Sequence, residues 1–146
     1  MKRAIVTMSI MLSLLAFAGN ALAGAPGKPQ TTCPVSGEKI DTASSPHLDW
    51  QGQRIYFCCN KCPVEFKKDP EKYFAKIAAE GVTLENTQTT CPVSDEKLGE
   101  GDMGAPVAVQ YKGRTVMLCC KMCQSKLEKE PAKYLAKLPG EQPPAK

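Results

Sequence analysis

The chain repeats itself, and each copy carries four cysteines. The segment Thr-Thr-Cys-Pro-Val-Ser-Gly-Glu-Lys-Ile at 31–40 returns as Thr-Thr-Cys-Pro-Val-Ser-Asp-Glu-Lys-Leu at 89–98. A Cys-Cys-x-x-Cys motif at 58–62 returns at 119–123. Repetition of this kind predicts one small folding unit that occurs twice. Whatever fold the chain adopts must therefore place four cysteines in each of two similar environments.

The repeat also sets the expected boundaries. The copies are offset by 58 residues at the first cysteine and by 61 at the cysteine pair, so the second copy has three extra residues in a loop. Units of about 45 residues rarely bury enough apolar surface to be stable without a metal, a disulfide or a partner. We expect unit 1 at 31–78, a polar linker at 79–88, unit 2 at 89–138 and a disordered, Pro-rich tail at 139–146.

The first residues have the pattern of a secretory signal peptide. Lys2 and Arg3 precede an apolar run at 4–17, and Ala21-Leu22-Ala23 follows as a small-residue cleavage signal. The run is 14 residues long, whereas a membrane-spanning helix needs about 18 or more. We therefore expect cleavage near Ala23, no stable membrane anchor, and a periplasmic or secreted protein.

The charge pattern argues against nucleic acid as a partner. The chain has 19 Lys and Arg against 15 Asp and Glu, a formal net charge of +4, and two of the positive charges belong to the expected signal peptide. In the helical part of unit 1, lysines such as Lys67 and Lys72 alternate with acidic residues such as Asp69 and Glu71. Such mixing is typical of a solvated helix face rather than a phosphate-binding surface.

Local patterns predict a small α+β unit. Residues on either side of Gly52 alternate between apolar and polar, which predicts a β-hairpin with Ile55 and Phe57 on its inner face. After the cysteine pair the apolar spacing becomes helical. Asp69 and Pro70 are a typical N-cap and first position of a further helix. Each unit should thus contain a turn that begins at its first cysteine, Cys33 or Cys91, which we call the Cys-bearing knuckle, followed by a β-hairpin and one or two short helices.

The cysteines of unit 1 are spaced to converge on one point. Cys62 lies one helical turn beyond Cys58 and Cys59, at a place where a strand leads into a helix. A helix N-terminus favours the thiolate, which is the form that binds metal. Cys33, in the knuckle, can complete such a site from a distant part of the sequence. The corresponding candidates in unit 2 are Cys91, Cys119, Cys120 and Cys123.

Both units resemble the heavy-metal-associated modules called YHS and TRASH domains. The resemblance rests on Cys-Pro-Val, the Gly turn, a cysteine pair spaced by three residues, a following Phe or Leu, and Pro-x-Lys-Tyr at the end of each unit. It implies two ligand sets: Cys33, Cys58 and Cys62, and Cys91, Cys119 and Cys123. The chain departs from the family where many relatives have a second knuckle cysteine, because Ser36 and Ser94 stand there. It also adds Cys59 and Cys120.

Two arrangements of the site remain open at the level of sequence. A closed site with four thiolates would use Cys59 or Cys120 and suits structural Zn(II). An open site with three thiolates suits Cu(I) or another thiophilic ion, and leaves a position for a ligand from a donor or acceptor protein. We favour the open arrangement slightly. The three-residue loop difference suggests that the two sites differ in affinity.

The cysteines are also compatible with functions that involve no metal. In an oxidising compartment, four cysteines in each unit can form disulfides, which would make the protein a stapled interaction module. Adjacent cysteines pair only with strain, which counts against that reading. Cys59 and Cys62 have the spacing of a thiol oxidoreductase, but no thioredoxin-like pattern surrounds them. We therefore expect an exported metal-binding protein for sequestration, transfer or sensing, and not an enzyme.

Three further side chains are weighed as ligands and set aside. The single histidine, His47, aligns with Ala108 in the other copy, so we expect it on a strand or on the surface. Met117 and Met122 lie close to the second cysteine cluster, but their counterparts are Tyr56 and Lys61. We expect core packing for Met117 and surface placement for Met122.

Overall fold

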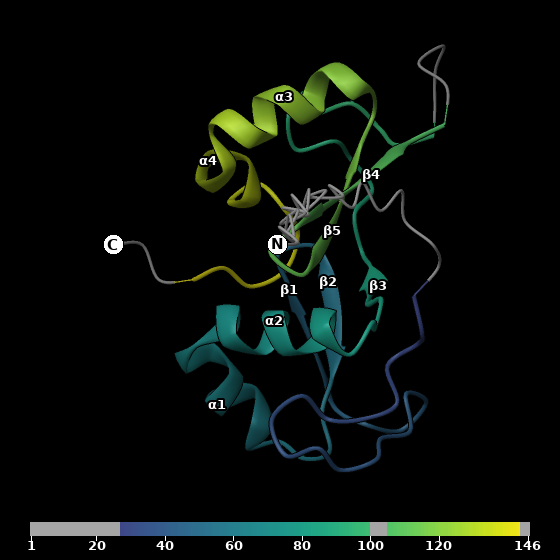
Figure 1. Cartoon of the computed structure of the whole chain (residues 1–146), viewed down its shortest axis with the longest axis vertical. Coiled ribbons are helices and arrows are strands. Elements are labelled where there is room, and N and C mark those ends of the chain that lie inside the picture. The colour runs from purple at the N-terminus through teal and green to yellow at the C-terminus, as the bar shows by residue number, and fades with distance from the viewer. Residues whose placement is uncertain (1–26, 100–104, 144–146) are drawn as a thin grey trace, which may run out of the picture.

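The computed structural model describes residues 27–99 and 105–143. The predicted signal peptide at 1–23 and residues 144–146 of the predicted tail lie outside the described residues. The described chain has small antiparallel sheets and short helices, which confirms the α+β class. The helices of the two units lie at opposite ends of the molecule and the hairpins lie between them (Figure 1).

Unit 1 contains the predicted hairpin and two helices. Its strands and helices are β1 (His47–Trp50), β2 (Gln53–Tyr56), α1 (Cys62–Lys68) and α2 (Pro70–Ala79). The hairpin turns at Gln51 and Gly52, whose φ angles are 44° and 76°. Positive φ at both central positions is typical of the two-residue turns that match strand twist. Asp69 caps α2 by accepting a hydrogen bond of 3.3 Å from the backbone N–H of Lys72, as its position before Pro70 predicts.

Unit 2 repeats this order, with a longer first helix and a shorter second one. Its elements are β4 (Val107–Tyr111), β5 (Arg114–Leu118), α3 (Lys121–Lys129) and α4 (Pro131–Leu135). The turn at Lys112 and Gly113 has φ angles of 46° and 78°, almost the same as in unit 1. The same local sequence signals therefore produce the same local structure twice, each time just before the cysteine pair.

Each unit has its own buried core, and each core includes cysteines. In unit 1 the apolar face of the hairpin packs on both helices, and Ile55, Phe57, Phe66 and Phe74 are fully buried. In unit 2 the corresponding core is mostly aliphatic, with Val116, Leu118 and Leu127 fully buried. The alternation predicted for the strand of Ile55 and Phe57 is confirmed.

The segment expected to be a linker is partly structured. It contributes β3 (Glu85–Asn86), which pairs antiparallel with β2 and makes a three-stranded sheet in the order β1-β2-β3. Helix α2 also extends one residue into this segment, to Ala79. Two residues of a strand carry too little pattern to be recognised in a sequence, so only the pairing with β2 identifies them.

The two units pack against each other through their hairpins. The Gln53 side chain donates a hydrogen bond of 2.9 Å to the backbone oxygen of Thr115 and accepts one from its N–H. Arg114 is 1% exposed, forms an ion pair of 2.6 Å with Glu71, and lies 4.0 Å from the centre of the Phe74 ring. A buried guanidinium needs such partners, so unit 1 supplies what unit 2 requires at this position.

Part of the expected disordered tail has ordered partners instead. The backbone N–H of Gly52 donates to the oxygen of Pro139 at 2.7 Å, and Glu141 exchanges hydrogen bonds with Asp49 and Gln51. The Glu141 carboxylate also lies 2.6 Å from the Lys67 ammonium group. The chain after α4 thus lies along β1 of unit 1. A Pro-rich composition did not reveal this because the partners are 74 to 92 residues away in the sequence.

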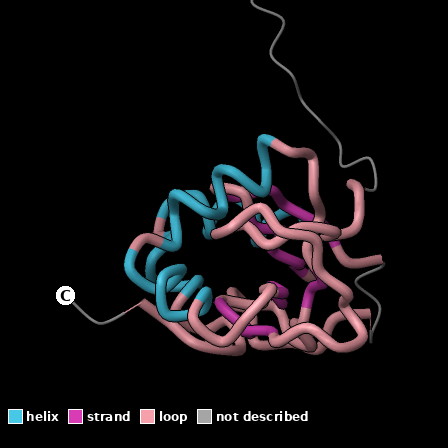
Figure 2. Tube along the Cα trace, turned by 90° about the horizontal axis from the view of Figure 1, so that it is seen from below, coloured by secondary structure: helices cyan, strands magenta, loops and turns pink. Residues whose placement is uncertain are grey.

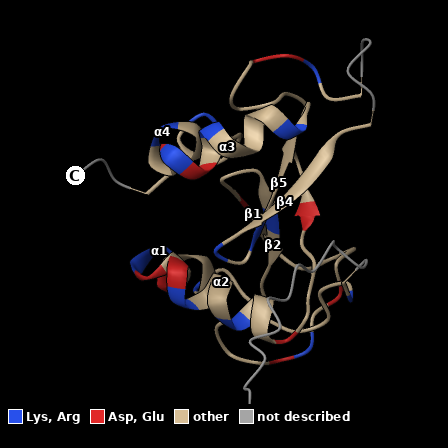
Figure 3. Cartoon of the chain, turned by 45° about the horizontal axis from the view of Figure 1, so that its top comes forward, with Lys and Arg blue, Asp and Glu red and all other residues tan. Residues whose placement is uncertain are grey.

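The helices gather on one side of the molecule, with strands and long loops beyond them (Figure 2). Lysine and arginine residues are interspersed with acidic residues along the helices (Figure 3), as the charge pattern predicts. Within the described residues, no helix has the length and apolar character needed to cross a bilayer.

Candidate metal centres

Three cysteines of unit 1 form a compact cluster. Cys33, Cys58 and Cys62 come from the knuckle, the residues after β2 and the first turn of α1, and their Sγ atoms all lie within 4.8 Å of one another. The Sγ atoms of Cys58 and Cys62 are 3.6 Å apart. Cys33 and Cys62 are buried, and Cys58 is half-buried. Unit 1 therefore brings together the three cysteines implied by the resemblance.

Unit 2 forms the equivalent cluster. The Sγ atoms of Cys91, Cys119 and Cys123 lie within 4.8 Å of one another, and those of Cys119 and Cys123 are 3.6 Å apart. All three cysteines are buried. The second ligand set is thus also brought together, although the loop that separates its members is longer by three residues.

The knuckle turns its backbone N–H groups toward the first cysteine. In unit 1, Cys33 donates to the oxygen of Glu38 at 2.8 Å and accepts from Gly37 at the same distance. Gly37 has a φ of 79°, a conformation that glycine adopts without strain. Asp95 holds the same position in unit 2 with a φ of 62°. The closed turn leaves the sulfur surrounded by peptide dipoles.

These dipoles stabilise the knuckle thiolates. Burial pushes the pKa of Cys33 up, but hydrogen bonds from the N–H groups of Ser36, Cys58 and Val35 and from the Ser36 hydroxyl outweigh it, and the pKa falls to about 7. The pKa of Cys91 also falls to about 7, for the same reasons at the equivalent positions. Near neutral pH, one sulfur in each cluster is thus partly in the thiolate form that binds metal.

The helix cysteines behave in the opposite way. Burial, followed by the neighbouring sulfurs of Cys59, Cys58 and Cys33, raises the pKa of Cys62 far above its usual value. The pKa of Cys123 is raised by burial and by its own neighbouring sulfurs. Several sulfurs packed together cannot all carry negative charge without a cation. A bound metal ion would supply that cation, so this crowding is the electrostatic pattern of a metal site.

The additional cysteines lie beside the clusters and outside them. The Sγ of Cys59 is 3.5 Å from that of Cys62, and the Sγ of Cys120 is 3.6 Å from that of Cys123. Neither belongs to the group of sulfurs that lie within 4.8 Å of one another. Cys59 is exposed and Cys120 is half-buried. The geometry thus favours three sulfurs around a common centre, with a fourth thiol at its edge.

The serines that replace a knuckle cysteine contact the clusters. The Ser36 hydroxyl lies 3.2 Å from the Sγ of Cys58, and the Ser94 hydroxyl lies 3.2 Å from the Sγ of Cys119. A hydroxyl that donates to a sulfur favours its thiolate form. Each serine therefore stabilises a cluster cysteine from the knuckle side.

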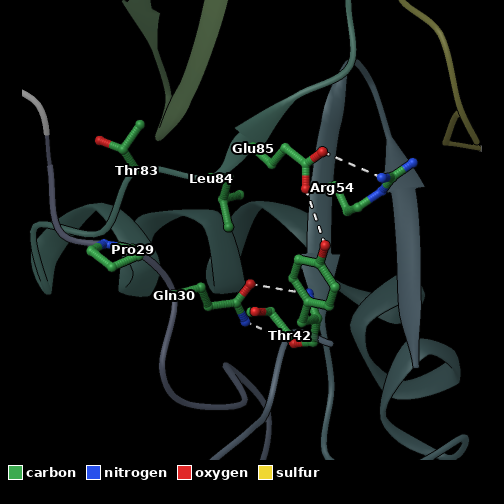
Figure 4. Close-up of a pocket in the computed structure, with 8 residues that line it drawn as sticks. Pro29, Gln30, Thr42, Arg54, Thr83, Leu84 and Glu85 are labelled. Atoms are coloured by element: carbon green, nitrogen blue, oxygen red, sulfur yellow. Dashed lines mark hydrogen bonds and ion pairs between the residues drawn. The ribbon is translucent and has the colours of Figure 1, made fainter. Parts of the chain in front are cut away.

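Two glutamines that sequence reasoning missed hold the clusters together. Gln30 donates to the backbone oxygens of Thr32 and Tyr56, at 3.0 and 2.7 Å, and accepts from the N–H of Tyr56 at 3.0 Å (Figure 4). Gln88 makes the same three bonds to Thr90 and Met117. Each glutamine joins the knuckle to the strand that precedes the cysteine pair, and we call Gln30 and Gln88 the glutamine clamps. The signal was present, because the repeat extends one residue earlier than Thr31 and Thr89.

A pocket lies beside the clamp glutamine of unit 1, Gln30. It has a volume of about 300 Å³ and lies between the clamp glutamine and β3 (Figure 4). Its polar groups bind one another: Glu85 accepts from the Tyr56 hydroxyl at 3.0 Å and from Arg54 at 3.3 Å. With these groups already paired, the cysteine clusters remain the stronger candidates for a functional site.

The side chains set aside as ligands lie outside both clusters. His47 is exposed on β1, with its ring 5.7 Å from that of Tyr56. Met122 is 74% exposed, as expected for a surface residue. Met117 is half-buried on β5 rather than part of the core. The expectation of core packing for Met117 is wrong because Val116 and Leu118 take the core face of β5, and Met117, which lies between them, falls on the opposite face.

The donor set fits a soft metal ion. Zn–S bonds of about 2.3 Å in a tetrahedron place sulfurs about 3.8 Å apart, close to the 3.6 Å between the paired sulfurs here. Thiolates prefer thiophilic ions such as Cu(I) and Zn(II) over hard cations such as Mg²⁺. Both clusters can therefore hold a metal ion after small rotations of their side chains.

The YHS domain family matches residues 32–76. The match covers most of unit 1 and includes Cys33, Cys58, Cys59 and Cys62, so the resemblance is confirmed for this unit. It does not extend to unit 2, whose likeness to unit 1 rests on the internal repeat and on the second cluster. No curated protein and no solved structure matches the chain.

Proposed function

We propose that the chain is an exported metal-binding protein in which each cluster of three thiolates holds one soft metal ion. The observation that carries the proposal is the convergence of three sulfurs within 4.8 Å in both units. In each unit the sulfurs come from two segments more than twenty residues apart. Convergence of distant thiols at the same place in two copies is expected of a shared ligand.

The geometry supports an open site rather than a closed one. Cys59 and Cys120 lie at the edge of the clusters, and Ser36 and Ser94 contact sulfurs from the knuckle side. Three-coordinate sulfur sites suit Cu(I), whereas structural Zn(II) is almost always held by four ligands. We therefore propose Cu(I) as the preferred ion and Zn(II) as the alternative.

The proposed role is to sequester, transfer or sense the ion, without a chemical change to a substrate. An ion held by three protein ligands can accept a fourth from another molecule, and such ligand exchange allows transfer between proteins. Cys58 is only half-buried, which leaves one ligand of the first site open to a donor or acceptor protein. The N-terminal sequence supports export to the periplasm or the cell exterior.

Native mass spectrometry of the mature protein, purified from the periplasm without chelator or reductant, tests this proposal. We expect two bound ions and the full mass of eight thiols. Cys33→Ser should remove one ion and Cys91→Ser the other, whereas the surface control Met122→Ser should keep both. The two knuckle variants separate the sites because each alters a single cluster.

The same measurement distinguishes a disulfide-stapled interaction module, the alternative that the close sulfurs also permit. Four disulfides would make the metal-free protein lighter by eight hydrogens, since all eight cysteines are free thiols in the structure. That mass, together with failure of the reduced protein to take up Cu(I) or Zn(II), would overturn the metal-binding proposal.

A further inference from the structure

Each unit contains a pair of thiols that shares one member with the metal cluster. Cys59 and Cys62 are separated by two residues, with their Sγ atoms 3.5 Å apart, and Cys120 and Cys123 repeat this at 3.6 Å. The first member lies outside the group of converging sulfurs and the second lies inside it. Any bond between the two sulfurs would therefore take a ligand away from the metal.

The backbone holds both pairs in the same tight turn. The N–H of Cys62 donates to the oxygen of Cys59 at 3.3 Å, and the N–H of Cys123 donates to the oxygen of Cys120 at 3.2 Å. The second cysteine of each pair lies in the first turn of α1 or α3. Because a disulfide needs its sulfurs about 2.05 Å apart, the two sulfurs must approach each other by only about 1.5 Å. Side-chain rotation can supply this movement without a change of fold.

The two members differ in access to solvent. Cys59 is exposed, whereas Cys62 is 7% exposed. An oxidant from solution therefore meets Cys59 first, and the buried partner is placed to complete the reaction. Cys33 is fully enclosed, and Cys58 is half-buried beside the Ser36 hydroxyl, so Cys59 is the most exposed thiol of unit 1.

We propose that Cys59 with Cys62, and Cys120 with Cys123, are oxidation sites at which disulfide formation releases the metal ion. The inference rests on the proposed metal-binding function and adds its regulation. Oxidation leaves only Cys33 and Cys58 at the first cluster, and two thiolates hold a soft ion more weakly than three.

The reaction is a thiol–disulfide exchange with a small or protein disulfide. The Cys59 thiolate attacks one sulfur of the disulfide, forms a mixed disulfide and releases one thiol. The Cys62 sulfur then leaves the metal, attacks the Sγ of Cys59, and releases the second thiol. Two electrons pass from the protein to the oxidant, and the two thiolates released from the oxidant take up two protons, one given up by the Cys59 thiol when it becomes a thiolate and one from water, because Cys62 is already deprotonated as a metal ligand.

The two units should differ in rate. Cys59 is exposed but Cys120 is half-buried, and the rate of exchange depends on access to the attacking thiol. The first site should therefore release its ion before the second. A structural role for the additional cysteines predicts no such order.

The test uses the mature, full-length protein loaded with Zn(II), which has no redox chemistry of its own. Oxidised glutathione is added without oxygen, a zinc-binding dye reports release, and peptide mapping identifies the disulfides. The test variant is the double change Cys59→Ser with Cys120→Ser. The matched control is Asn60→Ser with Lys121→Ser, which alters the neighbouring exposed positions.

We expect the unaltered protein and the control to release zinc while two disulfides form, Cys59 with Cys62 first and Cys120 with Cys123 second. The double cysteine variant should bind the same amount of zinc and release it about tenfold more slowly. Equal release rates, or disulfides that join Cys33 or Cys58 instead, would overturn the inference alone. No zinc uptake by any reduced sample would overturn the proposed function for zinc and the inference with it.

A second readout does not depend on metal. The reduced, metal-free chain should lose two hydrogens from each unit on treatment with oxidised glutathione, and the double cysteine variant should instead keep a mixed disulfide or remain reduced. Loss of the same hydrogens in both proteins would show that other cysteines react, and would overturn the assignment of these pairs.

Discussion

The two units place three sulfurs in the same arrangement but surround them with different cores. In unit 1, Phe66 lies 5.5–5.8 Å from the rings of Trp50, Phe57, Tyr73 and Phe74. In unit 2, Leu127 takes the place of Phe66, and the aromatic residues are reduced to Tyr111 and Tyr134. Aromatic side chains bury more area and interact through their rings. Unit 1 therefore holds its cysteines with more apolar packing than unit 2 does.

The clusters themselves differ in charge and exposure. The Ser36 hydroxyl lowers the pKa of Cys58, but the Glu38 carboxylate and burial together raise it above its usual value. In unit 2 the Ser94 hydroxyl lowers the pKa of Cys119, but burial and the sulfurs of Cys91 and Cys120 raise it above its usual value. In unit 1 a nearby negative charge thus disfavours the thiolate of Cys58, whereas in unit 2 burial is the main factor that disfavours the thiolate of Cys119. Unit 1 therefore combines a more accessible cluster with a more extensively packed core, and unit 2 combines a more enclosed cluster with a less extensively packed core.

Removal of the metal should give the largest difference between the units. Bound metal contributes on the order of 10 kcal/mol to the folding of small thiolate modules, and unit 2 has less apolar packing to replace it. After chelation of the reduced protein, we expect amide protection to fall more in α3 and β5 than in α1 and β2. Hydrogen exchange with mass detection measures this directly. An equal loss in both units would break the comparison.

The cores can be compared by truncating their central residues. Phe66→Ala should cost about 4 kcal/mol of unfolding free energy and Leu127→Ala about 3 kcal/mol, because Phe66 fills more space and contacts four rings. Denaturant unfolding of the reduced, metal-loaded protein measures both values. Val64→Ala, at an exposed position in α1, is the control and should change little. A larger loss for Leu127→Ala would reverse the ranking of the two cores.

The glutamine clamps should matter in both units. Gln30→Ala and Gln88→Ala each leave backbone groups without their partners, at a cost of about 2 kcal/mol. Each variant should also lower the metal affinity of its own cluster, since the knuckle is no longer tied to the strand. Titration of each variant with Zn(II) resolves the two sites. Gln110→Ala, which removes only an exposed bond to Thr115, is the control, and an effect of equal size there would refute the role of the clamps.

The smallest expected effect concerns the charge at the first site. Glu38→Gln removes the carboxylate that opposes the Cys58 thiolate, so the pKa of Cys58 should fall and site 1 should bind metal a few-fold more tightly at neutral pH. Such a gain corresponds to about 0.5–1 kcal/mol, typical of an exposed charge, and should shrink at high salt. Competition with a zinc dye measures it. Glu96→Gln, the equivalent change in unit 2, should have no comparable effect.

The parts of the molecule that the sequence predicted are those set by local chemistry. The hairpins follow from the Gly turns, α2 follows from Asp69 and Pro70, and the two clusters follow from the cysteine spacing. The pattern of Ile55 and Phe57 identified the core face in advance. In the hairpins, α2 and the core face, the residues that decide the structure are near neighbours in the chain, whereas Cys33 and Cys91 join their clusters from a distant segment.

The parts that escaped prediction depend on distant partners. Nothing near Arg114 reveals that it will be buried against Glu71 and Phe74 of the other unit. Residues 139–141 became ordered because the backbone of the first hairpin offers them hydrogen bonds. The exclusion of Cys59 and Cys120 from the clusters also required coordinates, since their spacing alone fits a fourth ligand equally well.

The glutamine and asparagine side chains along β5 have a consequence for how copies of this protein meet. An exposed strand edge can pair with the edge of another molecule and begin aggregation. Here the amides of Gln53, Asn86 and Gln88 occupy backbone groups of Thr115 and Met117. These side chains take the place of a neighbouring strand without offering an edge of their own. At high protein concentration, this edge of β5 is therefore not available to pair with a strand of another molecule.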